Sequence, residues 1–197
     1  ILMSNLENIY IQILIISTII LGLIGLIDDY IKVFKKDKKG LKGKFKIAGQ
    51  SLLGIFVGII LLTNNNITIV EFDNNLNSDK IEFSKIEEVK SYKTTIPFFK
   101  NNELDYKEIS KAIFGKGSNY LWLIIIPIII FIIAAVSNSN NLTDGLDGLS
   151  AGLSAIIVFT LGVFAWTSGN IIFSDYLNIM YIPRVGEITI FIAALLG

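Results

Sequence analysis

The segment IYIQILIISTIILGLIGLIDD, residues 9 to 29, determines which kind of fold is open to this chain. Its first nineteen residues, Ile9 to Ile27, carry no charge, and a helix of that length can cross a hydrocarbon core about 30 Å thick. Two adjacent carboxylates, Asp28 and Asp29, follow directly. The segment therefore predicts a membrane-spanning helix with a pair of acids at one end.

Further apolar runs recur along the chain, which is 52% hydrophobic with a mean hydropathy of +0.63. None of the runs alternates between polar and apolar residues, as the strands of a membrane β-barrel would. The predicted fold class is therefore all-α, a polytopic transmembrane helical bundle with a partly structured external loop. Five spans are expected, at residues 9–27, 47–63, 120–136, 149–167 and 188–197.

The ends of the sequence suggest an internal part of a longer protein, truncated at both ends. Ile1-Leu2-Met3 do not resemble a natural start, and no basic segment precedes the first apolar run as it would in a signal peptide. The last residues, Phe191 to Gly197, stop inside an apolar run. We expect residues 1–197 to form a single transmembrane domain.

The charged loops orient the spans. The segment Asp28 to Lys46 carries three aspartates and eight lysines, at positions 32, 35, 36, 38, 39, 42, 44 and 46. Short loops rich in lysine stay in the cytoplasm, so this loop is predicted to be cytoplasmic. By parity the stretch 64–119 is external and 137–148 is cytoplasmic again. The two acidic motifs of the chain therefore share one face of the membrane.

The residue types missing from this sequence exclude several chemistries. There is no cysteine, so disulfides, thiolate catalysis and cysteine zinc sites are excluded. There is no histidine to act as a base or a metal ligand. The formal net charge is zero, which gives no electrostatic case for binding nucleic acid.

The acid pair belongs to a motif, Gly25 to Tyr30, at the end of an uncharged span. Ionised groups at membrane depth are costly and mark function more often than not. Adjacent acids also repel each other unless a cation lies near, and Lys32 or a divalent metal could supply that cation. The alternative is a solvated helix end that carries its acids by chance.

The lysine-rich loop after this motif has two interpretations. In the first, the lysines only set the topology. In the second, some of them bind a phosphorylated, anionic substrate, since lysine serves phosphate as a mobile point charge. Gly40 and Gly43 interrupt the run and would let the backbone approach such a ligand.

The segment NSNNLTDGLDGL, residues 138 to 149, is the more informative motif. It lies in the predicted loop between two spans and combines acids, amides and a hydroxyl with two glycines. Carboxylate and amide oxygens are ligands that magnesium prefers, and glycines expose backbone N–H groups to a nucleotide or a phosphate. The alternative is a polar turn that begins the next span, with Asp147 as its N-cap.

Local patterns predict three smaller features. Ile67 to Phe72 has the composition of a strand, and Tyr106 to Phe114 that of a short amphipathic helix. The asparagine-rich stretch after the second span is expected to be a solvated connector. Gly152 and Gly162 would allow close contacts between the fourth span and its neighbours.

Both motifs resemble those of one enzyme family, the bacterial phospho-N-acetylmuramoyl-pentapeptide transferases. Gly25 to Val33, followed by Lys36 to Leu41, is similar to that family's aspartate-pair motif. Asn141 to Leu149 resembles its nucleotide-site motif residue for residue. Ile96 to Lys100 and the Gly186-Glu187 start of the last span are similar as well. The similarity covers nearly the whole chain except the asparagine-rich insertion.

The resemblance implies a longer polytopic enzyme of which this chain is roughly the middle half. Such enzymes transfer phospho-N-acetylmuramoyl-pentapeptide from UDP-N-acetylmuramoyl-pentapeptide to undecaprenyl phosphate, giving lipid I and UMP in peptidoglycan biosynthesis. The resemblance further implies Mg²⁺ as cofactor and a single catalytic domain that forms a homodimer in the lipid bilayer. The implied location is the bacterial cytoplasmic (inner) membrane, with the active site facing the cytoplasm.

The resemblance also assigns roles to residues of this sequence. Asp28 and Asp29 match the catalytic acids, and we expect Asp28 to be the base or the phosphate-organising acid, with Asp29 as its partner. Lys44 matches a lysine that contacts the phosphate region, and Asn141 matches a metal ligand. The residues implied to bind the substrate, the last three of them at the uracil, are Asp144, Gly145, Leu146 and Asp147.

The sequence departs from the family pattern in two places. Ser139 and Asn140 replace small or apolar residues, and the family's later metal-binding aspartate and histidine-rich loop would lie beyond Gly197. The nearest alternative is a related enzyme that uses another UDP-N-acetylhexosamine. The remote alternative is a transporter, but transporters tend to bury acids near the bilayer midplane, whereas every charge here lies at or beyond the end of a predicted span.

Overall fold

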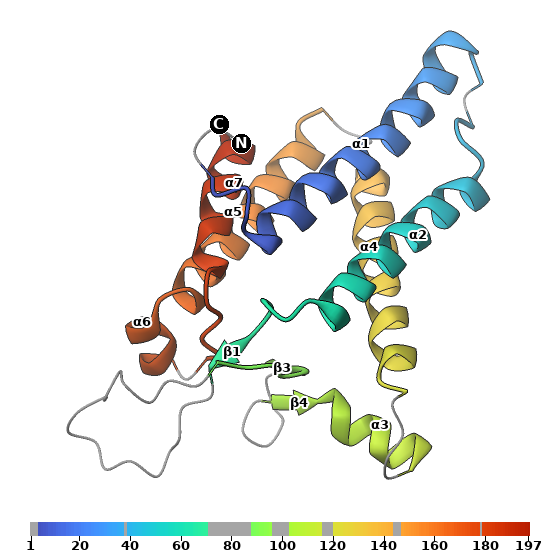
Figure 1. Cartoon of the computed structure of the whole chain (residues 1–197). Coiled ribbons are helices and arrows are strands. Elements are labelled where there is room, and N and C mark those ends of the chain that lie inside the picture. The colour runs from blue at the N-terminus through green and yellow to red at the C-terminus, as the bar shows by residue number, and fades with distance from the viewer. Residues whose placement is uncertain are drawn as a thin grey trace, which may run out of the picture. The chain divides into compact units, whose positions relative to one another are not determined.

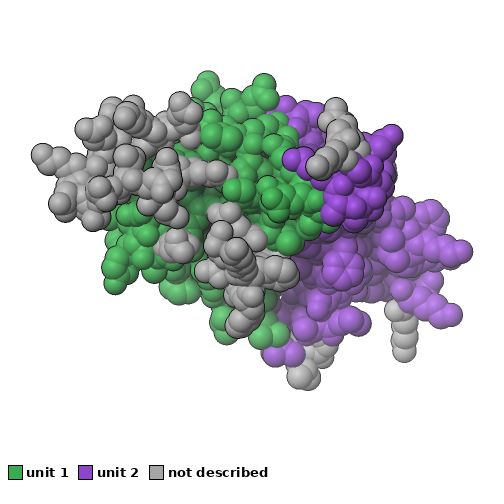
Figure 2. Space-filling view, turned by 90° about the horizontal axis from the view of Figure 1, so that it is seen from below, with its two compact units in different colours: residues 1–11, 65–109, 153–197 green, residues 12–64, 110–152 purple. Residues whose placement is uncertain are grey.

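The structure, a computed structural model, describes residues 4–37, 39–70, 88–95, 103–115, 120–143, 147–177 and 179–197. The chain divides into two compact units, which Figure 2 shows in different colours. The first unit consists of residues 1–11, 65–109 and 153–197, and the second of residues 12–64 and 110–152. Each unit therefore combines segments that are far apart in the sequence.

Long apolar helices dominate the chain (Figure 1). Within the described residues, four helices are long and apolar enough to cross a membrane, namely α1 (Ile9–Phe34), α2 (Gly43–Thr63), α4 (Trp122–Thr143) and α5 (Leu149–Ser168). Few of their residues are buried by the rest of the described chain. The prediction of an all-α polytopic membrane bundle is thereby confirmed.

The first unit contains most of α5 together with several short helices and strands. Its other helical elements are α6 (Ile171–Tyr176), a 3₁₀ turn (Val185–Glu187) and α7 (Ile188–Leu196). Its strands form two antiparallel pairs, β1 (Ile69–Val70) with β2 (Glu88–Val89), and β3 (Lys93–Thr95) with β4 (Glu103–Asp105). These short pairs are the partly structured portion of the stretch that was predicted to be external.

Two predictions of local structure fall in that stretch. The amphipathic helix expected at Tyr106 to Phe114 is confirmed as α3, with the same bounds. Of the strand expected at residues 67–72, the structure has Ile69–Val70 as β1. Residues 71–87 of the asparagine-rich insertion lie outside the described residues, and so does the segment Ile96 to Lys100.

The predicted close helix contacts of the fourth span are confirmed at one glycine. A Cβ on Gly162 would lie 2.9 Å from Cγ2 of Ile192 in α7, so a larger residue there would require the Ile192 side chain to shift. For Gly152 the prediction is wrong as far as the described residues go, because none of their atoms lies within 4 Å of the corresponding position.

Two helices continue well past the predicted ends of their spans, and α2 begins at Gly43 instead of the predicted residue 47. α1 continues through the acid pair to Phe34, and α4 continues to Thr143, through the asparagines that were expected in a loop. These polar side chains bond to their own helix: Asn138 Nδ2 donates to the Ala134 carbonyl and Thr143 Oγ1 to the Asn140 carbonyl, each at 2.8 Å. Because the helix itself satisfies these groups, they do not force the chain out of it.

Within the second unit, α2 packs against α4 through two glycines that are one helical turn apart. A Cβ on Gly54 would lie 2.6 Å from Cγ1 of Ile130, and one on Gly58 would lie 2.9 Å from Cγ1 of Ile126. Lipid tails are as apolar as leucine, so helices in a membrane associate mainly by such close van der Waals contact between small residues and their partners. The two glycines thereby fix which face of α2 is turned towards α4.

Replacing Gly54 by Ala is expected to destabilise the packing of α2 against α4 by about 1–3 kcal/mol, as overpacking does elsewhere. The new methyl group would meet both the side chain and the backbone of Ile130. Thermal unfolding of the full-length protein in detergent measures the loss. Gly22→Ala is the matched control, since no described atom lies within 4 Å of its Cβ position. Equal melting temperatures for the two variants would contradict the prediction.

Candidate active site

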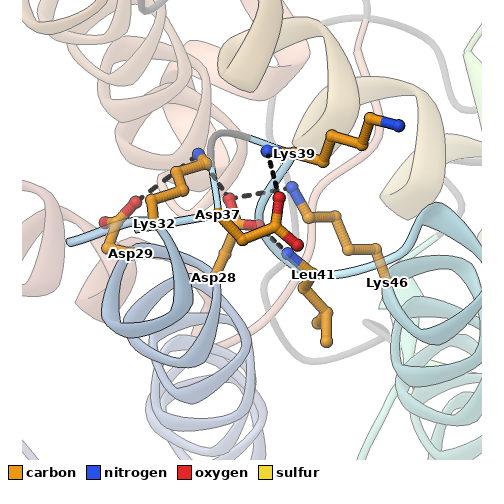
Figure 3. Close-up of polar contacts among 7 residues, drawn as sticks. All are labelled: Asp28, Asp29, Lys32, Asp37, Lys39, Leu41 and Lys46. Carbon is orange, nitrogen blue, oxygen red and sulfur yellow. Dashed lines mark hydrogen bonds and ion pairs between the residues drawn. The ribbon is translucent and has the colours of Figure 1, made fainter. Parts of the chain in front are cut away.

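Asp28 is held by three separate segments of the second unit. Only 3% of its surface is exposed. Its Oδ2 forms ion pairs with Lys32 Nζ at 2.6 Å and with Lys46 Nζ at 2.9 Å, and its Oδ1 accepts a hydrogen bond from the Leu41 N–H at 2.7 Å (Figure 3). α1, the loop that follows it and the first turn of α2 therefore converge on one carboxylate.

The two ammonium groups compensate a charge that burial alone would make costly. Lys32 follows Asp28 by four residues, so one helical turn brings both side chains to the same face of α1. Lys46 reaches the same oxygen from α2. Two ammonium groups thus lie against one buried carboxylate, and Asp29 lies 3.6 Å from Lys32 Nζ on its exposed side. An ammonium group can exchange a carboxylate for another anionic ligand such as phosphate.

The loop between α1 and α2 folds back over Asp28. Gly40 is buried with φ of +64°, and a Cβ there would collide with Oδ1 of Asp28. Asp37 stabilises the turn, because its Oδ1 accepts the Lys39 N–H and its carbonyl accepts the Gly40 N–H, each at 3.0 Å. The sequence predicted that this glycine lets the backbone approach a ligand; in the structure the backbone approaches Asp28 itself.

Replacing Gly40 by Ala is expected to lower the free energy of unfolding by at least about 1–2 kcal/mol, which is the cost of a left-handed conformation for a residue with a Cβ. The collision with Asp28 adds to that cost. Thermal unfolding of the full-length protein in detergent tests this. The control is Gly43→Ala at the first residue of α2, where no described atom lies within 4 Å of the Cβ position. A loss as large at Gly43 would refute the stated cause.

Asp29 has a different environment from Asp28, because successive residues of a helix point about 100° apart. Its side chain is 75% exposed and lies 3.6 Å from Lys32 Nζ. It lines an apolar groove of about 560 Å³ together with Leu26, Tyr30, Val33 and Phe34. In Figure 3 its carboxylate points away from that of Asp28, with Lys32 between them. The two acids are thus neighbours in sequence with separate surroundings.

A cavity of about 180 Å³ lies beside Asp28 and joins the two motifs. Asp28 from the first motif and Asn141 from the second both line it. Its other lining residues come from α1, α2 and α4 and are Leu21, Ile24, Gly25, Lys46, Gln50, Ser137, Asn138 and Asn140. The α1 side of the wall therefore combines apolar residues with the acid Asp28, and the α4 side is rich in amides.

The remaining residues that the sequence predicted for the site do not line the cavity beside Asp28, or lie outside the described residues. Lys44 is exposed in the first turn of α2, and it is Lys46, two residues later, that reaches Asp28. Asp147 is exposed, and Gly148 rather than Asp147 directly precedes α5, so Asp147 is not in the N-cap position. Asp144, Gly145 and Leu146 lie outside the described residues.

Sequence reasoning did not single out Lys46 or Gln50, although a signal was present. Lys46, Gln50, Gly54 and Gly58 recur every four residues along α2 and therefore share one face of it. That face makes the ion pair to Asp28, lines the cavity and packs on α4. A lone amide such as Gln50 in an otherwise apolar span is a marker of this kind of face.

The donor atoms at the cavity fit a magnesium ion that also takes ligands from water and substrate. Within the described part of the chain, no group of three or more Asp, Glu, His or Cys side chains could hold a metal. One carboxylate residue, Asp28, and one amide residue of the second motif, Asn141, line the same cavity. Mg²⁺ commonly binds through one or two protein oxygens, several waters and substrate phosphates, so water can complete the shell in the free protein and substrate phosphates can replace that water.

Comparison with known proteins gives a match along the length of the chain. Residues 11–193 match the family model of glycosyl transferase family 4. The phospho-N-acetylmuramoyl-pentapeptide-transferases of Flavobacterium psychrophilum and Amoebophilus asiaticus are each 56% identical, over 205 and 199 residues, and that of Bacteroides fragilis is 47% identical over 202 residues. These alignments cover 100% of this chain and 49%, 48% and 47% of the respective relative. The chain thus spans about half the length of the curated relatives it matches.

Proposed function

The chain belongs to glycosyl transferase family 4, and from that premise we propose that its protein transfers phospho-N-acetylmuramoyl-pentapeptide from UDP-N-acetylmuramoyl-pentapeptide to undecaprenyl phosphate. The products are lipid I and UMP, in a step of peptidoglycan biosynthesis. The observation that carries the proposal is the cavity where Asp28, Lys46 and Asn141 meet at the ends of membrane-spanning helices. The names of the relatives support the choice of substrates.

The proposed reaction brings two anionic substrates together. A phosphate oxygen of undecaprenyl phosphate forms a bond to the sugar-linked phosphorus of the nucleotide, the bond from that phosphorus to the bridging oxygen breaks, and UMP leaves. Lys32 and Lys46 are placed to neutralise the phosphates and to stabilise the charge that develops on the leaving group. Phosphates that reach the cavity compete with Asp28 for these lysines, and the released carboxylate can then accept the proton of the lipid phosphate.

Mg²⁺ is part of this proposal, with Asn141 as the residue that would hold it beside the substrate phosphates. When bound, it supplies positive charge that offsets the repulsion between the two phosphorylated substrates. Asn141 contributes a neutral oxygen and so adds no negative charge where phosphates must gather. The residues of the second motif beyond Asn141, from Asp144 to Asp147, are proposed to bind the uridine part.

The proposed location is the bacterial cytoplasmic (inner) membrane, with the site on the cytoplasmic side. The lysine-rich loop supports this orientation, since loops of that composition remain inside. Undecaprenyl phosphate has its chain in the bilayer and its phosphate at the surface. Asp28 follows the uncharged residues 9–27 of α1 directly, which suits a group that must meet a phosphate at that level.

The test is release of UMP from UDP-N-acetylmuramoyl-pentapeptide by the purified full-length protein, with undecaprenyl phosphate and Mg²⁺. Release that requires both the lipid and the metal is the expected result. Release only from UDP-N-acetylglucosamine would assign the protein to the related sugar-1-phosphate transferases. A folded protein that releases UMP from neither donor would reject the proposed function and reopen the transporter alternative.

A further inference from the structure

Gln50 is a buried amide in a membrane-spanning helix, and nothing in the reaction chemistry above requires it. Only 2% of its surface is exposed. It lies one helical turn from Lys46, which holds Asp28, and one turn from Gly54, which packs on α4. Its Nε2 donates to Ser137 Oγ at 3.0 Å, and its Oε1 accepts from Asn138 Nδ2 at 3.0 Å. Both partners lie near the end of α4 and line the cavity.

The backbone carbonyl of Ala134 determines which groups donate and which accept in the network of Gln50, Ser137 and Asn138. Asn138 Nδ2 donates to the carbonyl of Ala134 at 2.8 Å, and a carbonyl can only accept. The Asn138 nitrogen must therefore face that carbonyl and also Gln50, which places Oε1 of Gln50 opposite it. Nε2 of Gln50 is then left to donate to Ser137. The amide of Asn138 is fixed with its nitrogen fully used, and its Oδ1 accepts no hydrogen bond from the described residues.

The network sets the rotation of the last turns of α4. Asn138 and Asn141 are three residues apart and so lie on neighbouring positions of one helix face. The hydrogen bonds to Gln50 therefore hold the face of α4 on which Asn138 and Asn141 line the cavity together with Asp28. We infer that Gln50 is a positioning residue, which holds the asparagines of α4 in the orientation that a divalent cation needs.

Packing alone does not explain Gln50. Gly54 and Gly58 already hold α2 against α4 deeper in the pair, and a leucine would fill the volume of Gln50 at lower cost of burial. Interhelical hydrogen bonds in membranes contribute only a little to stability on average. An amide differs from a leucine at this position because it has one donor end and one acceptor end. It therefore fixes one arrangement of donors and acceptors beside the cavity.

The experiment measures binding of Mn²⁺, as a paramagnetic probe for the Mg²⁺ site, to the full-length protein in detergent without substrates. Electron paramagnetic resonance of the free ion gives the affinity. Gln50→Leu is expected to weaken binding about tenfold, the lower end of the effect of residues that orient metal ligands. Ser137→Ala should weaken it in the same direction by less, since Asn138 still contacts Gln50. Gly58→Ala is the matched control on the same face of α2; it should lower the melting temperature and leave the affinity within about twofold.

An affinity for Mn²⁺ in Gln50→Leu equal to that of the wild type would overturn the inference. An equal loss of affinity in Gly58→Ala would overturn it too, because both outcomes would mean that Gln50 contributes only to helix packing. A wild-type protein that binds no Mn²⁺ would overturn it as well. The inference rests on the proposed function for the identity of the site, but the two fail separately: a wild-type protein that binds Mn²⁺ and releases no UMP rejects the function, while the comparison of variants still decides the role of Gln50.

Discussion

Asp28→Asn is expected to lower the rate of UMP release by about 10²- to 10⁴-fold, the usual contribution of a positioned acid–base group. Asparagine keeps an oxygen that can accept the Leu41 N–H, so the loop over the site retains its anchor. It cannot accept a proton, and it leaves Lys32 and Lys46 without their shared counter-charge. The measurement is steady-state release of UMP by the full-length protein with both substrates and Mg²⁺ at saturation.

Asp37→Asn is the matched control for Asp28→Asn, because it makes the same chemical change in the loop that covers the site. Asp37 is exposed, and an asparagine oxygen can still accept the Lys39 N–H that its carboxylate accepts now. Its rate should stay within about twofold of the wild type, as for surface changes that keep their hydrogen bond. Turnover by Asp28→Asn within tenfold of the wild type, in a protein that still inserts into membranes, would end the assignment of Asp28.

Lys46→Met is expected to lower the same rate by about 10²- to 10³-fold, the loss typical of removing one group that stabilises transition-state charge. Methionine keeps much of the aliphatic stem, whereas the ammonium group 2.9 Å from Asp28 Oδ2 is lost. Only 16% of the Lys46 side chain is exposed, so solvent and salt replace its charge poorly. The rate should therefore recover little when the ionic strength is raised.

Lys44→Met decides between two assignments of the phosphate-binding lysine. The sequence alone predicted Lys44, which is exposed, whereas the structure brings Lys46 to Asp28. On the structural assignment, Lys44→Met should lose less than about tenfold in rate, since exposed ion pairs contribute little. A larger loss in Lys44→Met than in Lys46→Met would return the role to Lys44.

The membrane helices could be predicted well from the sequence because hydropathy is a local property. Nineteen uncharged residues before Asp28 predict a span whatever lies elsewhere in the chain, and α1 starts at the predicted Ile9. The ends of α1 and α4 could not be predicted in the same way. The criterion of an apolar run stops at the first polar residues, whereas these helices continue because their polar side chains find partners in the helix itself or across the bundle.

Some features of the candidate site could likewise be predicted from the sequence, and others could not. The acid pair and the asparagine-containing motif are visible as polar residues next to uncharged runs, and their pairing on one membrane face follows from counting spans. The roles of Asp28, Asp29, Lys44, Asn141 and the residues from Asp144 to Asp147 stay predictions. The structure adds that Asp28 and Asn141 line one cavity, and that Asp29 faces an apolar groove instead.

The sequence by itself determined the long apolar spans and the acidic motifs, since each depends on residues close together in the chain, and counting the spans predicted that the two motifs share one face. Only the tertiary structure decided that Lys46 rather than Lys44 pairs with Asp28, that Gly40 closes over it, and that Gln50 bonds to the end of α4. The physical reason is that hydropathy does not fix how a helix is rotated about its own axis. That rotation decides which side chains face a neighbouring helix. It is set by contacts such as that of Gly54 with Ile130, whose partners lie far apart in sequence.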